Sequence, residues 1–243
     1  MNLLEEIEEY WNLRSNGFSS SVREELCECG ESISGKLCGN LSLERGSKVL
    51  DLGCGPGLFS ILMARMGMDV IGVDYSPRMV ETARENASVE GLDIEFRRMD
   101  AQDMDFKDGT FDAVVSRNMF WTLPEPEKCY SEVSRVLKHG GKALVMDGNF
   151  YLHHYNEDYR IEPTGRETDI NRHGRHNTDN VDFGIMDRIA RELPLSRVER
   201  PSWDVNVLCK SGFIDIRVSL PPITDEVSRS RRIPPFMIVA ERG

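Results

Sequence analysis

The sequence lacks any apolar run approaching the roughly 18 residues that mark a membrane-spanning helix. Its first ten residues are acidic and carry no apolar core like that of a secretory signal peptide. Positive charge is also scarce, because 30 Lys and Arg stand against 41 Asp and Glu, a net charge of −11. This balance disfavours nonspecific nucleic-acid binding, which needs a basic face. We therefore expect a cytoplasmic protein with neither a membrane nor a nucleic-acid partner.

Cysteine is irregularly spaced, with six in 243 residues. In a long chain without a secretion signal, this pattern favours free thiols in a reducing compartment over a disulfide framework. Cys27 and Cys29, with Cys38 nearby, form a group that suits a metal or metalloid trap, but its C-x-C spacing is not that of common zinc sites. We expect no metal site, and a thiol or metalloid acceptor stays an alternative substrate.

What the sequence does have is a glycine-rich turn in the segment VLDLGCGPG, residues 49–57. A short apolar strand ends in an acid and enters the turn, and an apolar segment at helical spacing follows at 58–67. Glycines let the backbone approach a ligand closely, and the free N–H groups of a helix start favour polar or anionic ligands. By itself the turn is ambiguous, because the dinucleotide fingerprint places its third glycine one residue later.

Strands alternate with helices through the middle of the chain, which predicts a doubly wound, parallel α/β sheet. The N-terminal region is expected to form a helix over 3–11, a polar loop over 12–21 and a second helix over 22–41. The expected strands are Lys48–Leu52, Asp69–Val73, Ile94–Arg97, Phe111–Ser116, Lys142–Met146, Phe213–Leu220 and Phe236–Glu241, and the later helices are 77–90, 125–138, about 183–193 and 202–211.

Polar groups follow the ends of four successive expected strands: the glycine turn, Asp74, Asp100, and Arg117 with Asn118. Ligands of open α/β sheets bind outside the carboxyl ends of the strands, so these groups should line one crevice. An acid about 20 residues after the glycines is placed to accept hydrogen bonds from ribose hydroxyls. Asp100 is placed to contact the edge of an adenine ring.

These motifs, in this order, resemble the class I S-adenosylmethionine-dependent methyltransferases of the small-molecule, methyltransferase type 11-like group. The resemblance covers roughly residues 47–147 and departs from the family at His139, where proline is usual. It implies a Rossmann-like, seven-stranded sheet, mostly parallel with an antiparallel last strand. The segments that carry it are VLDLGCGPG (49–57), GVDYSPRM (72–79), DAQDMDF (100–106), FDAVVSRN (111–118) and EVSRVLKHGG (132–141).

The resemblance also implies which residues bind the cofactor, S-adenosyl-L-methionine, and its product, S-adenosyl-L-homocysteine. They are Asp51, Gly53, Cys54, Gly55 and Gly57 around the methionine moiety, Asp74 at the ribose with Tyr75 and Met79 nearby, Asp100, Ala101 and Gln102 at the adenine, and Arg117 and Asn118 under the sulfonium.

We expect one methyltransferase domain over 1–243, divided into a helical N-terminal cap (1–46), a cofactor-binding core (47–148), a substrate-side insert after strand five (149–200), and a C-terminal helix and strand pair (201–243). The irregular insert is long for an ordinary connection, which favours a functional role. It holds four of the five histidines: His153, His154, His173 and His176.

The acceptor pocket should lie between the cap, the loop after strand four and the insert. The substrate contacts expected there are Tyr10, Trp11, Arg14, Trp121 and Tyr155. His153 and His154 are candidates for a general base, and their alternatives are metal ligands or members of a solvated loop.

The activity implied is in-line transfer of a methyl group to a small molecule, a reaction in which the protein mainly positions and desolvates the nucleophile. The alternatives are a tRNA or protein methyltransferase, a thiol or metalloid methyltransferase, and a protein that binds the cofactor without catalysis. The glycine spacing and the motifs at Asp100 and Arg117 argue against an NAD-dependent oxidoreductase. The sequence does not indicate an oligomeric state.

Overall fold

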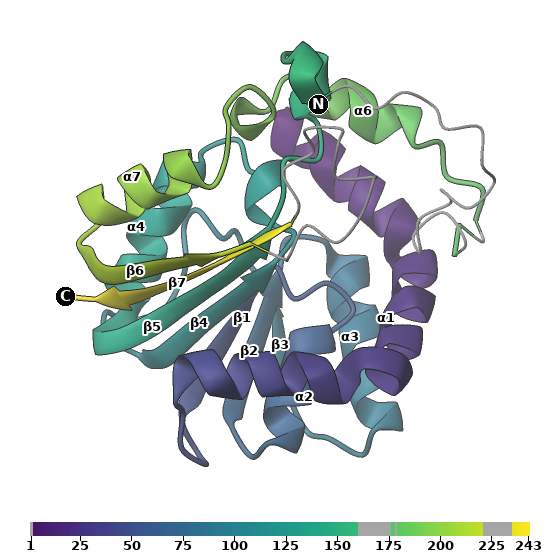
Figure 1. The fold of residues 1–243 in the computed structure, drawn as a ribbon. Helices are drawn as coiled ribbons and strands as arrows, with labels where there is room; N and C mark the ends of the chain where they lie inside the picture. Colours follow the sequence, from purple (N-terminus) through teal and green to yellow (C-terminus); the bar gives the residue numbers. More distant parts are fainter. Residues whose placement is uncertain (1, 160–175, 178, 221–234) are drawn as a thin grey trace.

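A single mixed sheet, of order β3-β2-β1-β4-β5-β7-β6, runs through the centre of the molecule (Figure 1). The structure is a computed structural model and describes residues 2–159, 176, 177, 179–220 and 235–243. β1 to β5 are parallel, whereas β7 is antiparallel to both β5 and β6. This confirms the predicted sheet. The strands are β1 (Lys48–Leu52), β2 (Asp69–Asp74), β3 (Glu95–Arg98), β4 (Phe111–Arg117), β5 (Leu137–Asp147), β6 (Phe213–Ser219) and β7 (Phe236–Arg242).

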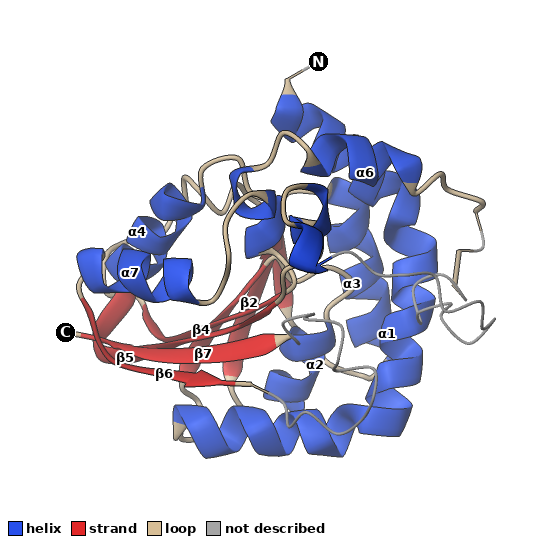
Figure 2. Ribbon diagram, turned by 45° about the horizontal axis from the view of Figure 1, so that its top comes forward, coloured by secondary structure: helices blue, strands red, loops and turns tan. Residues whose placement is uncertain are grey.

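Helices cover both faces of the sheet (Figure 2). In β1, Val49 packs with the residues of α1, α2 and α3, while Leu50 and Leu52 pack with those of α4 and α7. Successive side chains of a strand point to opposite faces, so one apolar strand supplies both cores. The helices are α1 (Leu3–Leu41), α2 (Leu58–Arg65), α3 (Pro77–Val89), α4 (Pro126–Val136), α6 (Gly184–Ala190) and α7 (Ser202–Lys210), with short 3-10 turns at η1 (Phe120–Thr122), η2 (Leu152–His154), η3 (Glu157–Tyr159) and η5 (Pro194–Ser196).

The predicted polar loop over 12–21 is wrong, because α1 is one continuous helix from Leu3 to Leu41. Its polar residues find partners that keep the helix intact. The Asn12 side chain accepts a hydrogen bond from the Ser76 hydroxyl (2.7 Å), and Ser19 bonds Asn86 of α3 (3.0–3.1 Å). Packing against α3 therefore overrides the weak intrinsic helix preference of serine and asparagine.

Figure 1 shows α1 as a long upright segment beside α3 that turns and continues beneath the sheet, next to α2. None of the helices in the described ranges is long and apolar enough to cross a membrane.

The boundary between α4 and β5 also differs from the prediction. The helix ends at Val136, and β5 begins at Leu137 instead of after the two glycines. Phe111 of β4 pairs with Leu137, and Ala113 pairs with Lys142, so the intervening residues bulge out of the ladder. Gly140 has a φ of 73°, a left-handed conformation that glycine adopts without strain.

A buried ionic cluster joins the end of β5 to the start of α7. The Arg200 guanidinium donates to Asp147 (2.7 Å) and to Asp204 (2.6 Å), and all three side chains are sealed from solvent. Tyr130 of α4 donates its hydroxyl to Asp204 (2.7 Å). Asp147 also accepts from the backbone N–H of Trp121 (3.2 Å), so the cluster fixes the loop after β4.

Replacing Arg200 with Ala should destabilise the chain strongly, because two buried carboxylates lose their counter-ion. Removing one partner of such a cluster costs about 3–5 kcal/mol of unfolding free energy. Urea denaturation measures the loss. Arg217→Ala is the matched control, since its pairing with Asp215 is exposed and should contribute less than about 0.5 kcal/mol. Equal losses in the two variants would contradict the role given to the cluster.

Candidate functional site

A cavity of about 600 Å³ opens at the carboxyl ends of β1, β2 and β4, between the sheet and α1. The sheet-order reversal lies here, as β1 is flanked by β2 on one side and β4 on the other. Most of the residues predicted to bind the cofactor line this cavity: Asp51, Gly53, Cys54, Gly55, Asp74, Tyr75, Met79, Asp100, Ala101, Arg117 and Asn118. The convergence of separate strand ends predicted from the sequence is thus present in the fold.

The glycine turn is held against the end of β2. The N–H groups of Gly53 and Cys54 both donate to the Val73 carbonyl (2.9 Å each). Gly53 has a φ of 69°, and a Cβ there would lie 2.3 Å from Cγ of Met119. No other residue type fits without displacing Met119, so glycine is required by both conformation and space.

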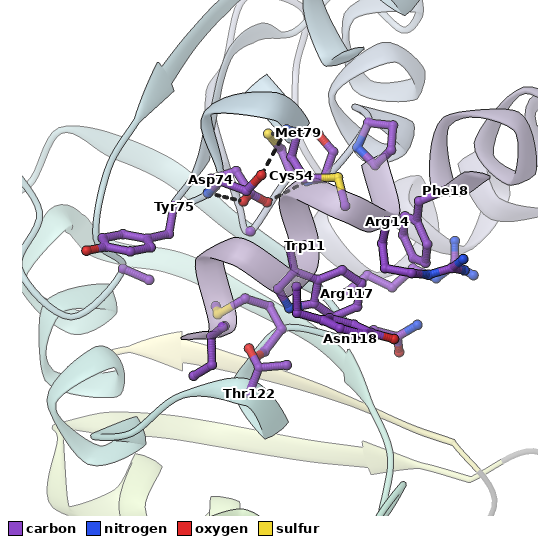
Figure 3. Close-up of a pocket in the computed structure, with 18 of the residues that line it drawn as sticks. Trp11, Arg14, Phe18, Cys54, Asp74, Tyr75, Met79, Arg117, Asn118 and Thr122 are labelled. Carbon is purple, nitrogen blue, oxygen red and sulfur yellow. Dashed lines mark hydrogen bonds between the residues drawn. The ribbon is translucent and has the colours of Figure 1, made fainter. Parts of the chain in front are cut away.

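Two carboxylates, the half-buried Asp74 and the buried Asp51, lie beside this turn, and Figure 3 shows Asp74 next to Cys54. Asp74 accepts hydrogen bonds from the N–H groups of Gly55 and Ser76 (2.9 Å each). Asp51 accepts from the N–H (2.8 Å) and the hydroxyl (2.6 Å) of Ser60. Burial raises the pKa of Asp51 to about 7 and that of Asp74 to about 6, and these hydrogen bonds oppose the rise.

Asp100 is oriented by Gln102, which was predicted to touch the adenine but does not line the cavity. The backbone and side-chain amides of Gln102 both donate to Asp100 Oδ1 (2.8 and 3.0 Å). The N–H of Glu125 in turn donates to Gln102 Oε1 (2.7 Å). Gly57 also lies outside the lining and serves packing, since a Cβ there would meet Ala83 at 3.4 Å. Both residues are supports behind the cavity wall.

Arg117, at the end of β4, forms a two-armed ion pair with Glu25 of α1. The nitrogen–oxygen distances are 2.7 and 3.0 Å, and both side chains are largely covered. Such bidentate pairing is strong and directional. Because both residues line the cavity, the pair anchors α1 over the strand ends.

Aromatic side chains line the part of the cavity beyond the glycine turn. Trp121 contacts Trp11 (ring centroids 6.4 Å apart), Phe150 (5.5 Å) and Tyr151 (5.2 Å). These four come from α1, from η1 after β4, and from the insert. The elements that enclose this end of the cavity are those between which the sequence places an acceptor pocket, which stays a prediction.

Arg14 is buried in the same wall, with an exposed fraction of 3 %. Its guanidinium donates to the Asn177 side chain (2.9 Å) and lies 4.8 Å from the centre of the Phe183 ring. The arginine thus ties α1 to the insert. Both Arg14 and Tyr10 line the cavity.

Two buried polar atoms in the cavity lining have no hydrogen-bond partner within the part of the chain that the structure describes. They are the Ser21 hydroxyl and the indole N–H of Trp121. A buried polar group without a partner is costly, and such groups are rare in native proteins. Both atoms belong to residues that line the cavity.

Three residues predicted for the acceptor side lie elsewhere. Tyr155 is 47 % exposed and donates its hydroxyl to the Arg191 carbonyl (2.5 Å). Its ring also lies against the Arg197 guanidinium, so it is occupied on the outside of the insert. His153 and His154 sit behind Tyr151, whose ring stacks on His154 (centroids 5.8 Å apart), and neither lines the cavity.

Other sequence candidates also lie away from the cavity lining. Cys27, Cys29 and Cys38 are on the outer part of α1, whereas Cys54 does line it. Burial raises the pKa of the Cys54 thiol well above its usual value, so the thiol stays protonated. His176 pairs with Glu24 (2.8 Å), and His173 falls outside the described residues.

The sequence prediction missed the middle of α1. Phe18, Ser21, Val22 and Glu25 all line the cavity, but the first two lay in the expected loop. A helical continuation was detectable from the four-residue spacing of Arg14, Phe18 and Val22, which places them on one face. The serines between these positions obscured the helical periodicity in the sequence.

The sheet order, the glycine turn and the acid ending β2 define a Rossmann-like, cofactor-binding protein. Residues 50–145 match a family model described as a methyltransferase domain. Over these residues the chain is similar to methyltransferases, which agrees with the resemblance drawn from the sequence.

Relatives share this central part of the chain. A phosphatidylethanolamine N-methyltransferase of Cereibacter sphaeroides is 40% identical over 105 residues, covering 42% of this chain and 51% of that one. A demethylmenaquinone methyltransferase of Thermus thermophilus is 36% identical over 111 residues, covering 44% of this chain and 50% of that one. The chain spans about half the length of the curated relatives it matches. The solved structure of the PH0226 protein from Pyrococcus horikoshii shares the fold, with a TM-score of 0.61 at 23% identity over 91% of both chains.

Replacing Asp51 with Asn should change how stability depends on pH. The pKa of Asp51 is about 7 in the folded chain and 3.8 as a reference value. The stability that the neutral Asp51 carboxyl contributes is therefore fully present below pH 3.8. It declines as the pH rises and is lost once the pH passes about 7, where the carboxyl of the folded chain ionises. Between about pH 5 and 6.5, the free energy of unfolding of the variant should therefore rise relative to that of the parent by about 1.4 kcal/mol per pH unit.

Urea denaturation of both proteins across this interval, and at about pH 8.5, measures the difference. Above the folded-state pKa the gain should level off. A difference that stays constant with pH would show that the carboxyl ionises as an ordinary exposed one does.

Proposed function

We propose that the chain is an enzyme that transfers a methyl group from S-adenosyl-L-methionine to a small-molecule acceptor. The observation that carries the proposal is one continuous cavity with two chemically different ends. The end at the glycine turn offers carboxylates and backbone, and the other offers aromatic rings. A donor and an acceptor held in one enclosed space react as if at high effective concentration.

The donor end matches the polar groups of the cofactor. Asp74 would accept hydrogen bonds from the ribose hydroxyls, since each carboxylate oxygen retains acceptor capacity beside its one backbone N–H. Asp100, at the start of the loop after β3, would meet the adenine edge. Phe18 lies against the glycine turn, 3.9 Å from the position of a Gly55 Cβ, so α1 would cover the bound methionine moiety.

The acceptor end favours a small molecule with an apolar or aromatic body and a polar oxygen. Trp11, Trp121 and Tyr151 supply flat apolar surfaces, which pair well with rings. The unpartnered indole N–H of Trp121 would donate to an oxygen of the acceptor. The relatives, named for demethylmenaquinone and phosphatidylethanolamine, are consistent with small acceptors of differing chemistry.

Chemically, the chain's contribution is positioning and exclusion of water. The sulfonium carries an activated methyl group, and the acceptor lone pair displaces the sulfur in line. The protonated Cys54 thiol beside the turn does not compete as a nucleophile, because burial holds its pKa high. The Arg117–Glu25 pair keeps α1 closed over the reacting groups.

Two alternatives have less support. A protein that only senses the cofactor needs no space beyond the methyl group, whereas this cavity extends to the insert. A thiol or metalloid acceptor held by Cys27, Cys29 and Cys38 would sit away from the cavity lining.

Replacing Asp74 with Asn should weaken binding of S-adenosyl-L-homocysteine by about 10- to 100-fold, the value of hydrogen bonds to a charged group. Calorimetric titration measures it. In the parent, affinity should be full when Asp74 is ionised and fall as the pH drops through about 6, where the carboxyl gains a proton. The variant should lose that pH dependence. Asp69→Asn, at the opposite end of β2, is the control and should bind as the parent does.

Replacing Trp121 with Phe removes the indole N–H and keeps an aromatic ring. Labelled S-adenosyl-L-methionine would be tested with a panel of phenols, hydroxyquinones and amines. For oxygen acceptors, kcat/KM should fall by about 2- to 13-fold, the value of one hydrogen bond, while cofactor affinity stays the same. Trp203→Phe, outside the cavity lining, is the matched control. Equal effects of the two substitutions would refute the donor role, and no transfer to any member would count against the acceptor class.

A further inference from the structure

Three metal-ligating side chains converge behind the aromatic wall of the cavity. Donor atoms of His153, His154 and Asp187 all lie within 4.8 Å of one another. The histidines belong to η2 and the aspartate to α6, two parts of the insert that are 33 residues apart in the chain (187 − 154). The proposed function uses none of the three.

The histidine rings converge where their backbone would tend to separate them. Consecutive side chains of a 3-10 turn diverge by about 120°. The ring centroids of His153 and His154 are nevertheless only 4.2 Å apart.

His154 adds an independent observation. Its side chain is only 8 % exposed, and its Nε2 atom is buried with no hydrogen-bond partner among the residues described. Asp187 Oδ1 lies 2.8 Å from this nitrogen, yet in a direction that forms no hydrogen bond. Two ligands of one zinc ion, each about 2.1 Å from it, lie about 3.0–3.4 Å apart. The nitrogen and the oxygen are close to that spacing.

We propose that His153, His154 and Asp187 bind a divalent transition-metal ion of the zinc type. Two imidazoles and one carboxylate form a donor set that such ions prefer, with a remaining position for water. The second oxygen of Asp187 accepts from Arg191 (3.1 Å), which leaves Oδ1 directed at the histidines.

The ion would brace the acceptor wall. Each side of the site adjoins a residue that lines the cavity. Tyr151 stacks on His154, and Met186 immediately precedes Asp187 in α6. A metal bond between η2 and α6 would hold the two sides of that wall together at a point outside the cavity. Its role is therefore structural and separate from the transfer step.

The test uses the full chain, stripped with a chelator, in a background where Cys27, Cys29, Cys38 and Cys209 are replaced by Ser. This removes the thiols that are not buried, which also bind zinc. Calorimetry with Zn²⁺ and absorption spectra with Co²⁺ should show one site without thiolate bands. His154→Ala and Asp187→Asn should each weaken Zn²⁺ binding by about 100-fold or more, because even outer-shell partners contribute about 10–100-fold.

His139→Ala is the matched control, since His139 lies in the bulge of β5 and bonds the Gly243 carbonyl. It should bind Zn²⁺ as the parent does, and circular dichroism should show that every variant is folded. Zn²⁺ should also raise the melting temperature of the parent but not of Asp187→Asn. Absence of a one-to-one site in the parent, or undiminished binding in His154→Ala and Asp187→Asn, would overturn the proposal.

Discussion

The hydrogen bond from the Gly55 N–H to the Asp74 carboxylate is the contact on which the site depends. It ties the turn after β1 to the end of β2, two strands already in parallel register. The turn and the first two residues of α2, Leu58 and Phe59, line the same cavity. The interaction requires an acidic side chain at the end of β2 and an accessible backbone N–H in the turn after β1. Asp74 and Gly55 supply these two groups, and both residues can be recognised in the sequence.

A second set of constraints encloses that turn. The Arg117–Glu25 pair and the bonds from Asn12 and Ser19 to α3 hold α1 across the strand ends. The buried Arg200 cluster fixes the end of β5 and, through Asp147, the backbone of Trp121. Polar contacts therefore position both walls around a cavity whose acceptor end is apolar. Among the residues that the structure describes, the indole N–H of Trp121 is one of three buried side-chain polar atoms without a hydrogen-bond partner, which supports the acceptor contact proposed for it.

Much of the cofactor side was predictable because its signals are local in sequence. Strand, glycine turn and acid follow one another within a few residues, and parallel strands bring their ends together. The continuous path of α1 left only a weak signal in the sequence, since Asn12 and Ser19 are stabilised in the helix by partners more than 60 residues away. Likewise, Tyr155 and His153 carry the residue types of a site, but the course of the insert decides which side chains face the cavity. Tyr151 faces it and Tyr155 does not.

Calorimetric titration of the unmodified chain with S-adenosyl-L-homocysteine and with NAD, side by side, tests the central claim most directly. The geometry of the turn, with its third glycine at 57 and carboxylates at Asp74 and Asp100, predicts one-to-one binding of S-adenosyl-L-homocysteine and no saturable binding of NAD. Saturable binding of NAD without binding of S-adenosyl-L-homocysteine would contradict the account.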